Sequence, residues 1–154
     1  EEQGTGMLFN MDGEVVGMIS SSVWNDTGKN VVNAYGISDL KPIIELLING
    51  KSVPYIGIYG TTVTEQLAEE HKMPSGIYVA DVDPDSPAMA AGIQIGDIIC
   101  EASGEEIKDI AAYQNIVIGS SVGETMEFVG KRLGSDGYVN IKFSVVTTEK
   151  EEVK

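Results

Sequence analysis

The sequence predicts a mainly β fold with short helices, of the α+β class. Apolar runs are separated by turn signals, such as Asp12-Gly13 near the start of the chain and Gly134-Ser135-Asp136-Gly137 near its end. Asp-Gly between apolar runs is a strong hairpin signal, because the favoured two-residue turn needs positive φ at both central positions. The stretches with helical spacing between the strands are short. At 154 residues, the chain is long enough for one ordinary domain and an additional segment.

The first fifty residues predict a β-meander followed by a helix. Strands are expected at 7–11, 14–24 and 31–37, because apolar runs there are broken by turn residues. The following helix has Ser38 or Asp39 as its N-cap and Pro42 in its first turn, where the missing N–H costs little. Asn49-Gly50 ends it.

A change of composition marks the boundary to a second unit. Lys51-Ser52-Val53-Pro54 reads as a linker, because proline and small polar residues interrupt both periodicities. Beyond it, strands are predicted at 55–59, 76–82 and 97–102, helices at 64–70 and 109–118, a turn with a short helix at 83–91, and a hairpin over 124–148. Asp85 and Ser86 are expected to cap the short helix that begins at Pro87. Residues 150–154 form a charged tail that should fray.

The composition is that of a folded acidic protein. The chain has 24 Asp and Glu residues against 10 Lys and Arg residues, a formal net charge of −14, and 42% hydrophobic residues. This hydrophobic content is too high for a disordered acidic chain. Because an acidic surface repels phosphate backbones and anionic lipids, we expect no nucleic-acid partner and no direct membrane contact.

Four motifs of the second unit carry a family resemblance. Tyr55-Ile56-Gly57-Ile58 matches the carboxylate-binding loop of the PDZ domains of the HtrA/Deg proteases. The family's run SPA…AGI…GD-I-I is matched in order by Ser86-Pro87-Ala88, Ala91-Gly92-Ile93 and Gly96-Asp97-Ile98-Ile99. The chain thus resembles that family, which implies a PDZ domain over residues 51–149 that recognises peptide C-termini.

The loop also predicts carboxylate binding on physical grounds. Successive N–H groups at Ile56, Gly57 and Ile58, where glycine lets the backbone curl, form a nest for an anion. An adjoining exposed strand edge can take a peptide as one more strand. The predicted peptide-binding residues are therefore Tyr55, Ile56, Gly57 and Ile58.

The resemblance places the far wall of the groove on the helix at 109–118. Ile110, Tyr113 and Val117 share one face of this helix, whereas Ala112 and Ile116 share another, and either face can point to the core. We expect Tyr113 and Ile116 to line the terminal side-chain pocket together with the two isoleucines of the loop.

Residues 1–50 carry a second resemblance. The run Gly6-Met7-Leu8-Phe9-Asn10-Met11-Asp12-Gly13-Glu14-Val15-Val16-Gly17 is similar to the stretch that follows the nucleophile of HtrA/Deg proteases. Residues 1–50 would then be the last strands and helix of a trypsin-like β-barrel. Gly4 stands at the position of that family's catalytic serine, and glycine has no nucleophile. The single histidine, His71, lies in the PDZ-like unit, so this chain should be inactive alone.

No cofactor or metal site is expected. Asp81, Asp83 and Asp85 resemble the start of a calcium loop, but that loop needs Gly at its sixth and Glu at its twelfth position, where this chain has Ser86 and Gly92.

The sequence therefore predicts a module that binds C-terminal or exposed hydrophobic peptide ends or unfolded segments. Its expected role is regulatory or substrate-recruiting, within an HtrA-like serine protease or pseudoprotease of protein quality control. The alternatives are the C-terminal part of an active serine endopeptidase whose catalytic residues lie outside this chain, and a structural adaptor. The resemblance implies a parent protein that acts outside the cytoplasm, as members of this family often do while tethered to the membrane. The unpaired N-terminal strands suggest self-association.

Overall fold

The structure is a computed structural model, and it describes residues 5–20 and 34–150. The chain divides into two compact units, Glu1–Gly50 and Lys51–Lys154. Gly4, residues 21–24 of the predicted strand at 14–24, residues 31–33 of the predicted strand at 31–37 and residues 151–154 of the predicted tail lie outside the described residues.

The first unit contains a three-stranded antiparallel sheet in the order β1-β2-β3. Its strands are β1 (Gly6–Phe9), β2 (Val15–Ile19) and β3 (Tyr35–Gly36). A turn lies between the first two strands as predicted, but its type differs, because Gly13 has φ +83° whereas Asp12 has no positive φ. The side chain of Asn10 accepts hydrogen bonds from the N–H groups of Asp12 and Glu14. Met7 and Phe9 are 63% and 60% exposed, so β1 shows apolar side chains to solvent.

Helix α1 (Ile37–Ile48) begins earlier than the sequence predicts. The N-cap is Gly36, without a side-chain hydrogen bond, so the prediction of Ser38 or Asp39 as the cap is wrong. The reason is that β3 pairs with β2 as far as Gly36, which leaves no residue between strand and helix. Pro42 consequently lies inside the helix rather than in its first turn. Asp39 does lie in the first turn, where a carboxylate interacts favourably with the helix dipole.

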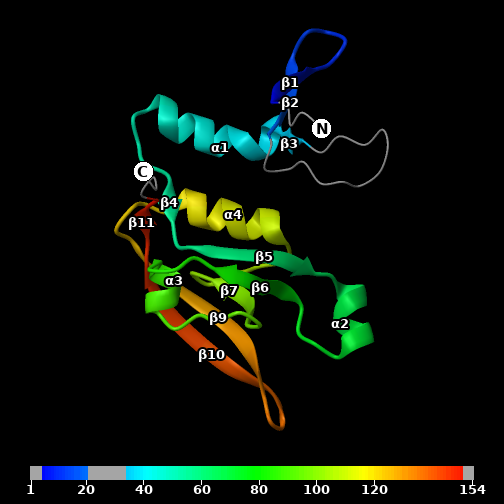
Figure 1. Cartoon of the computed structure of the whole chain (residues 1–154), viewed down its shortest axis with the longest axis vertical. Helices are drawn as coiled ribbons and strands as arrows, with labels where there is room; N and C mark the ends of the chain where they lie inside the picture. The colour runs from blue at the N-terminus through cyan, green and yellow to red at the C-terminus, as the bar shows by residue number, and fades with distance from the viewer. Residues whose placement is uncertain (1–4, 21–33, 151–154) are drawn as a thin grey trace. The chain divides into compact units, whose positions relative to one another are not determined.

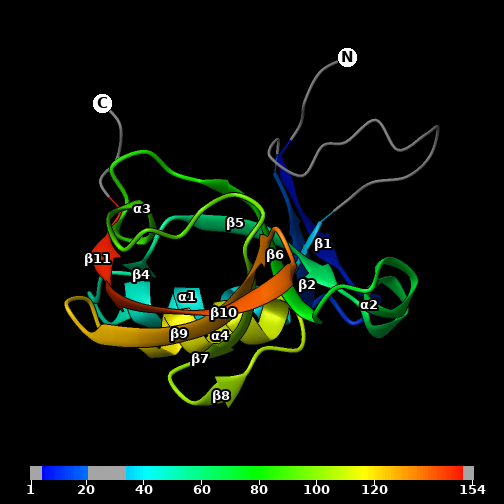
Figure 2. The same cartoon turned by 90° about the horizontal axis from the view of Figure 1, so that it is seen from below.

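The second unit is built on an antiparallel sheet in the order β10-β9-β7-β6-β5 (Figure 1). Strand β8 pairs with β7. A two-stranded ladder joins β4 to β11. The strands are β4 (Pro54–Tyr55), β5 (Ile58–Val63), β6 (Gly76–Val82), β7 (Ile98–Ala102), β8 (Glu105–Glu106), β9 (Thr125–Gly134), β10 (Gly137–Val146) and β11 (Thr148–Glu149). In Figures 1 and 2, β4 and α2 lie at opposite ends of β5.

The predicted strand at 55–59 is wrong. The chain forms β4 and β5 instead, interrupted at Ile56 and Gly57, because Gly57 has φ +86° and extended backbone needs negative φ. The predicted strand at 76–82 is confirmed as β6. The short strand β8 was not predicted.

Three helices complete the second unit, and each has a side-chain cap. They are α2 (Glu65–His71), α3 (Pro87–Ala90) and α4 (Ile110–Gly119). Their caps are Thr64, Ser86 and Asp109, each of which accepts a hydrogen bond from the N–H group three residues later. The predicted cap at Ser86 is confirmed.

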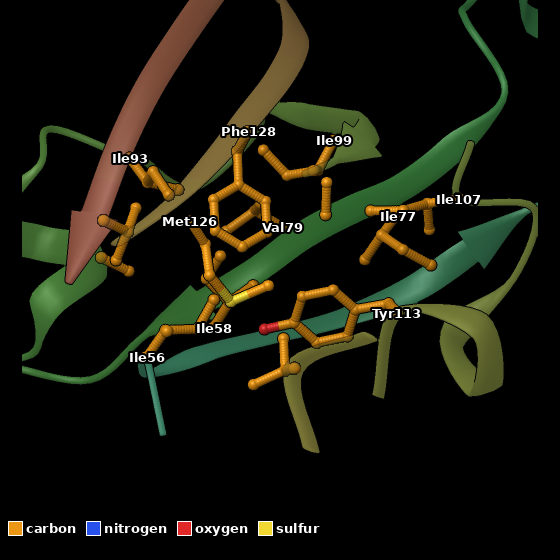
Figure 3. Close-up of a cluster of buried hydrophobic side chains, with 14 of the residues drawn as sticks. Ile56, Ile58, Ile77, Val79, Ile93, Ile99, Ile107, Tyr113, Met126 and Phe128 are labelled. Atoms are coloured by element: carbon orange, nitrogen blue, oxygen red, sulfur yellow. The ribbon is translucent and has the colours of Figure 1, made fainter. Parts of the chain in front are cut away.

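The core of this unit lies between the sheet and α4 (Figure 3). Phe128, Ile77 and Val79 are fully buried, at 0% exposure. Tyr113 and Val117 are the buried residues of α4. Of the two faces that the sequence left open, the one with Tyr113 and Val117 therefore points to the core.

Candidate functional site

Strand β5 forms an open edge of the sheet in the second unit. Gly57 O accepts a hydrogen bond of 2.9 Å from Asp83 N, so Ile58, opposite Val82, occupies a non-hydrogen-bonded pair. The N–H and C=O groups of Val79 bind Asp97 and Gly96, so Gly60, opposite Val79, is not bonded to β6 either. The backbone groups of Ile58 and Gly60 consequently face the open edge, where they can pair with an added strand.

The loop at the start of β5 has its carbonyl groups satisfied and its N–H groups free. Ile56 O accepts from Ala88 N and Gly57 O accepts from Asp83 N, both at 2.9 Å. Within the described part of the chain, the N–H groups of Ile56 and Gly57 donate no hydrogen bond. Free successive N–H groups in a curled backbone are suited to a carboxylate.

Only glycine fits at the centre of this loop. Gly57 has φ +86°, and a Cβ atom there would lie 2.3 Å from the Cβ atom of Ser86 and 2.9 Å from the hydroxyl oxygen of Tyr55. The loop is thus packed tightly against the residue that caps α3. This packing holds the N–H groups in place before any ligand binds.

The structure brings three of the predicted pocket residues together. Ile56, Ile58 and Tyr113 are 2%, 8% and 6% exposed and belong to one core cluster, in which Figure 3 shows the ring of Tyr113 among the other side chains. Ile116 also packs against this cluster. However, it lines a pocket of about 340 Å³ with Ser103 and Met126.

Helix α4 is joined to the far part of β5. The N–H group of Ile110, at the start of the helix, donates a hydrogen bond of 3.0 Å to the hydroxyl oxygen of Thr62. This bond links the start of α4 directly to the edge strand.

A polar cluster next to the loop was missed by the sequence reasoning. The carboxylate of Asp83 accepts hydrogen bonds from the hydroxyl groups of Tyr55 and Tyr59, the latter at 2.8 Å. Lys150 Nζ donates to the hydroxyl oxygen of Tyr59 at 2.9 Å and lies 3.6 Å from the same carboxylate. The i, i+4 spacing of the two tyrosines is visible in the sequence, but nothing local connects them with Lys150.

The cluster shifts the titration of its members. Hydrogen bonds from Tyr55 and then Tyr59 hold the pKa of Asp83 below its ordinary value. Burial, followed by the hydrogen bond to Asp83, raises the pKa of the Tyr55 hydroxyl. The hydrogen bond to Tyr59 raises the pKa of Lys150. All three groups therefore keep their usual charges at neutral pH.

In the part of the chain that the structure describes, no group of three or more His, Cys, Asp or Glu residues is arranged to hold a metal ion. Among the described residues, none of the helices combines the length and the apolar character that a membrane span requires.

Comparisons with known proteins agree with this geometry. The family model of the PDZ domain matches residues 78–132. The "Probable periplasmic serine endoprotease DegP-like" of Halomonas elongata is 31% identical over 142 residues, which cover 88% of this chain and 30% of that protein.

Two solved structures resemble the chain over different lengths. The HtrA3 PDZ domain bound to the phage-derived ligand FGRWV is 33% identical, with a TM-score of 0.51, and the match covers 61% of this chain and 84% of that one. The serine endoprotease from Yersinia pestis is 26% identical, with a TM-score of 0.53, and the match covers 95% of this chain and 47% of that one. Fold, loop and sequence together define a PDZ domain in the second unit. The chain belongs to the HtrA/DegP family of serine proteases, and it spans about 30% of the length of the first curated relatives it matches.

Proposed function

We propose that the second unit binds the C-terminus of a peptide as an additional strand along β5. The terminal carboxylate is bound by the N–H groups of Ile56 and Gly57, and the peptide backbone pairs with Ile58 and Gly60. The observation that carries this proposal is that the loop carbonyls are bonded to Ala88 and Asp83 while the N–H groups beside them are free. The HtrA3 PDZ domain, which is bound to a peptide ligand in its solved structure, supports the same function.

The side chain of the terminal residue is proposed to lie against Ile56, Ile58 and Tyr113. These residues belong to one buried apolar cluster, so a terminal side chain that packs against this cluster is favoured when it is apolar. Ile116 is not assigned to this contact, because it lines the pocket beside Ser103.

The test is a titration of the 154-residue chain with the pentapeptide FGRWV, prepared as the free acid and as the C-terminal amide, and followed by a panel of peptides with other C-termini. Binding of the acids and loss of affinity for the amides is the expected result, because an amide has no charge for the loop to bind. Equal affinity of both forms would remove the loop from the site.

A pair of glycine variants tests the loop independently of the ligand chemistry. Gly57→Ala should abolish binding, because its Cβ atom would lie 2.3 Å from Ser86. The control is Gly104→Ala, at a glycine with φ +84° and no atom within 4 Å of the added Cβ. It carries the same backbone strain without the clash, and it should bind as the wild type does. Loss of binding in both variants would mean that general destabilisation, not the loop, is measured.

For the whole protein we propose a substrate-recruiting or regulatory role in an HtrA-like protease or pseudoprotease of protein quality control outside the cytoplasm. The first curated relatives are named periplasmic serine endoproteases, which supports the location. Gly4 at the serine position favours the pseudoprotease. The competing proposal, an active endopeptidase, predicts that the full-length protein digests an unfolded protein such as casein and that a serine-directed inhibitor stops it.

We also propose self-association of the first unit, supported by the exposed apolar side chains Met7 and Phe9 of β1. Sedimentation of the full chain at increasing concentration tests it, and a monomer throughout would contradict it.

A further inference from the structure

The ammonium group of Lys150 is held by three different groups. Its Nζ atom donates to the Tyr59 hydroxyl at 2.9 Å, lies 3.6 Å from the Asp83 carboxylate, and sits 5.2 Å and 5.6 Å from the ring centroids of Tyr55 and Tyr59. An ammonium group near two aromatic rings and a carboxylate is in a cage that favours a cation. Here the cation comes from the residue that follows the last strand, β11.

This cage lies directly beside the proposed carboxylate loop. Tyr55 is the first residue of the loop and Tyr59 follows its last residue directly, while the N–H group of Asp83 donates to Gly57 O. The hydroxyl oxygen of Tyr55 would be 2.9 Å from a Cβ atom on Gly57. The side chain of Asp83 thus touches the residues on both sides of the loop.

The position of Asp83 creates an electrostatic conflict. Its carboxylate stays ionised because two tyrosine hydroxyl groups donate to it. A negative charge next to an anion-binding loop opposes the binding of a second carboxylate. The chain as a whole adds to this opposition, since its formal net charge is −14. The cation nearest to Asp83 among the described residues is Lys150.

Lys150 also fastens the end of the chain. Strand β11 pairs with β4 through only two residue pairs, Thr148 with Tyr55 and Glu149 with Pro54. A two-residue ladder is weak without further contacts. The contacts of Lys150 with Tyr55 and Tyr59 add further links between the end of β11 and the loop.

We propose that Lys150 is a positioning residue for the carboxylate loop. Its ammonium group neutralises the Asp83 carboxylate next to the loop, and its contacts with Tyr55 and Tyr59 fasten β11, so that the loop accepts a charged peptide terminus. The proposal rests on the proposed function. It assigns to the C-terminal segment a part in ligand selection: Lys150 raises the affinity for a free carboxylate relative to an amide.

The test compares Lys150→Met, which keeps the aliphatic stem and removes the charge, with the control Lys142→Met. Lys142 is an exposed lysine on β10, so the control changes the net charge equally. With FGRWV as the probe, Lys150→Met should weaken binding of the free acid about three- to tenfold, as expected for one unit charge at this range near a surface. Binding of the amide should stay unchanged.

Two further variants separate charge from structure. Lys150→Arg keeps the cation and should bind like the wild type. Asp83→Asn combined with Lys150→Met removes both charges, and it should recover the preference for the acid over the amide. Equal losses for acid and amide in Lys150→Met, or no recovery in the double variant, would overturn the charge role.

A readout without peptide keeps this proposal distinct from the proposed function. In Lys150→Met, the amide of Asp83, which donates to Gly57 O, should exchange its hydrogen with solvent faster than in the wild type, as measured by NMR. If the wild type binds neither peptide form, the proposed function and the charge role both fail, and the exchange rate still decides whether Lys150 fastens the loop. Unchanged exchange would overturn that role.

Discussion

The most stringent stability prediction concerns the ion pair of Asp97 and Arg132. Asp97 is 1% exposed, and its carboxylate accepts from Arg132 Nε at 2.6 Å, from Arg132 Nη2 at 2.7 Å and from the N–H group of Gln94 at 2.9 Å. The substitution Arg132→Met removes two of these three donors and leaves a buried carboxylate with one. Removing one partner of a buried pair typically costs about 3–5 kcal/mol.

The magnitude follows from the exposure of the two partners. The side chain of Arg132 is 33% exposed, whereas that of Asp97 is 1% exposed, so the charge that Arg132→Met leaves unpaired is the one that water cannot reach. We therefore expect the full loss of about 3–5 kcal/mol. For a unit of this size it corresponds to a decrease of roughly 15–30 °C in Tm.

The assay is urea unfolding of the full chain, followed by circular dichroism, with Lys142→Met as the control for the lost positive charge. Adding Asp97→Asn to Arg132→Met removes the buried charge but keeps an oxygen acceptor for the Gln94 N–H group. The double variant should therefore be more stable than Arg132→Met alone. If Arg132→Met costs less than about 1 kcal/mol, the desolvation argument is refuted, because a buried unpaired carboxylate cannot be that cheap.

Three further predictions concern the titration, capping and packing of the second unit. Hydrogen bonds from Tyr55 and Tyr59 hold the pKa of Asp83 below its ordinary value of 3.8, so their stabilisation is present above that value and is lost as the pH falls through the lowered pKa. The stability difference between wild type and Asp83→Asn should therefore shrink on acidification, and a constant difference in urea midpoints would contradict this. Asp109→Ala should lower the free energy of unfolding by about 1 kcal/mol, because the 2.7 Å hydrogen bond that caps α4 is lost. Asp109→Ser, whose hydroxyl group can also cap the helix, should retain the stability. Phe128→Ala should cost about 3–5 kcal/mol, since Phe128 is 0% exposed, and a cost below about 1 kcal/mol would exclude tight packing there.

The features that the sequence predicted well are encoded locally. Strand β6 was predicted with its observed bounds, because β-branched residues alternate between turn signals. The predicted cap at Ser86 depends on a side chain and an N–H group three residues apart, so a single stretch of sequence contains both partners. The prediction of helix and turn positions in the second unit succeeded for the same reason.

The features that the sequence missed depend on partners far along the chain. The start of α1 is set by the pairing of β3 with β2, not by the good capping residue Ser38. The sequence predicts that the backbone curls at Gly57, but it does not show that this curl divides the predicted strand at 55–59 into β4 and β5. Lys150 contacts Tyr59 across 91 positions, and no periodicity can reveal such a pair.

The sheet of the second unit has two open edges in its order β10-β9-β7-β6-β5, and they differ in a way that favours β5 as the binding edge. Natural sheets protect free edges with charged side chains, prolines or bulges, because unpaired backbone groups attract other strands. Strand β10 carries Lys142 on its length, which opposes the pairing of another strand. Strand β5 has the sequence IYGTTV, without a charged residue or proline.

A strand edge without such protection needs another feature that restricts which peptide segments can pair with it. On β5 this limit lies at the strand's start, where the free N–H groups of Ile56 and Gly57 can end an added strand at its carboxylate. An internal segment of a folded protein has no carboxylate at that point, so it forms the backbone pairs without the charge-assisted hydrogen bonds. Under the proposed function, selective recognition of chain ends and resistance to unselective pairing would thus follow from the same few residues.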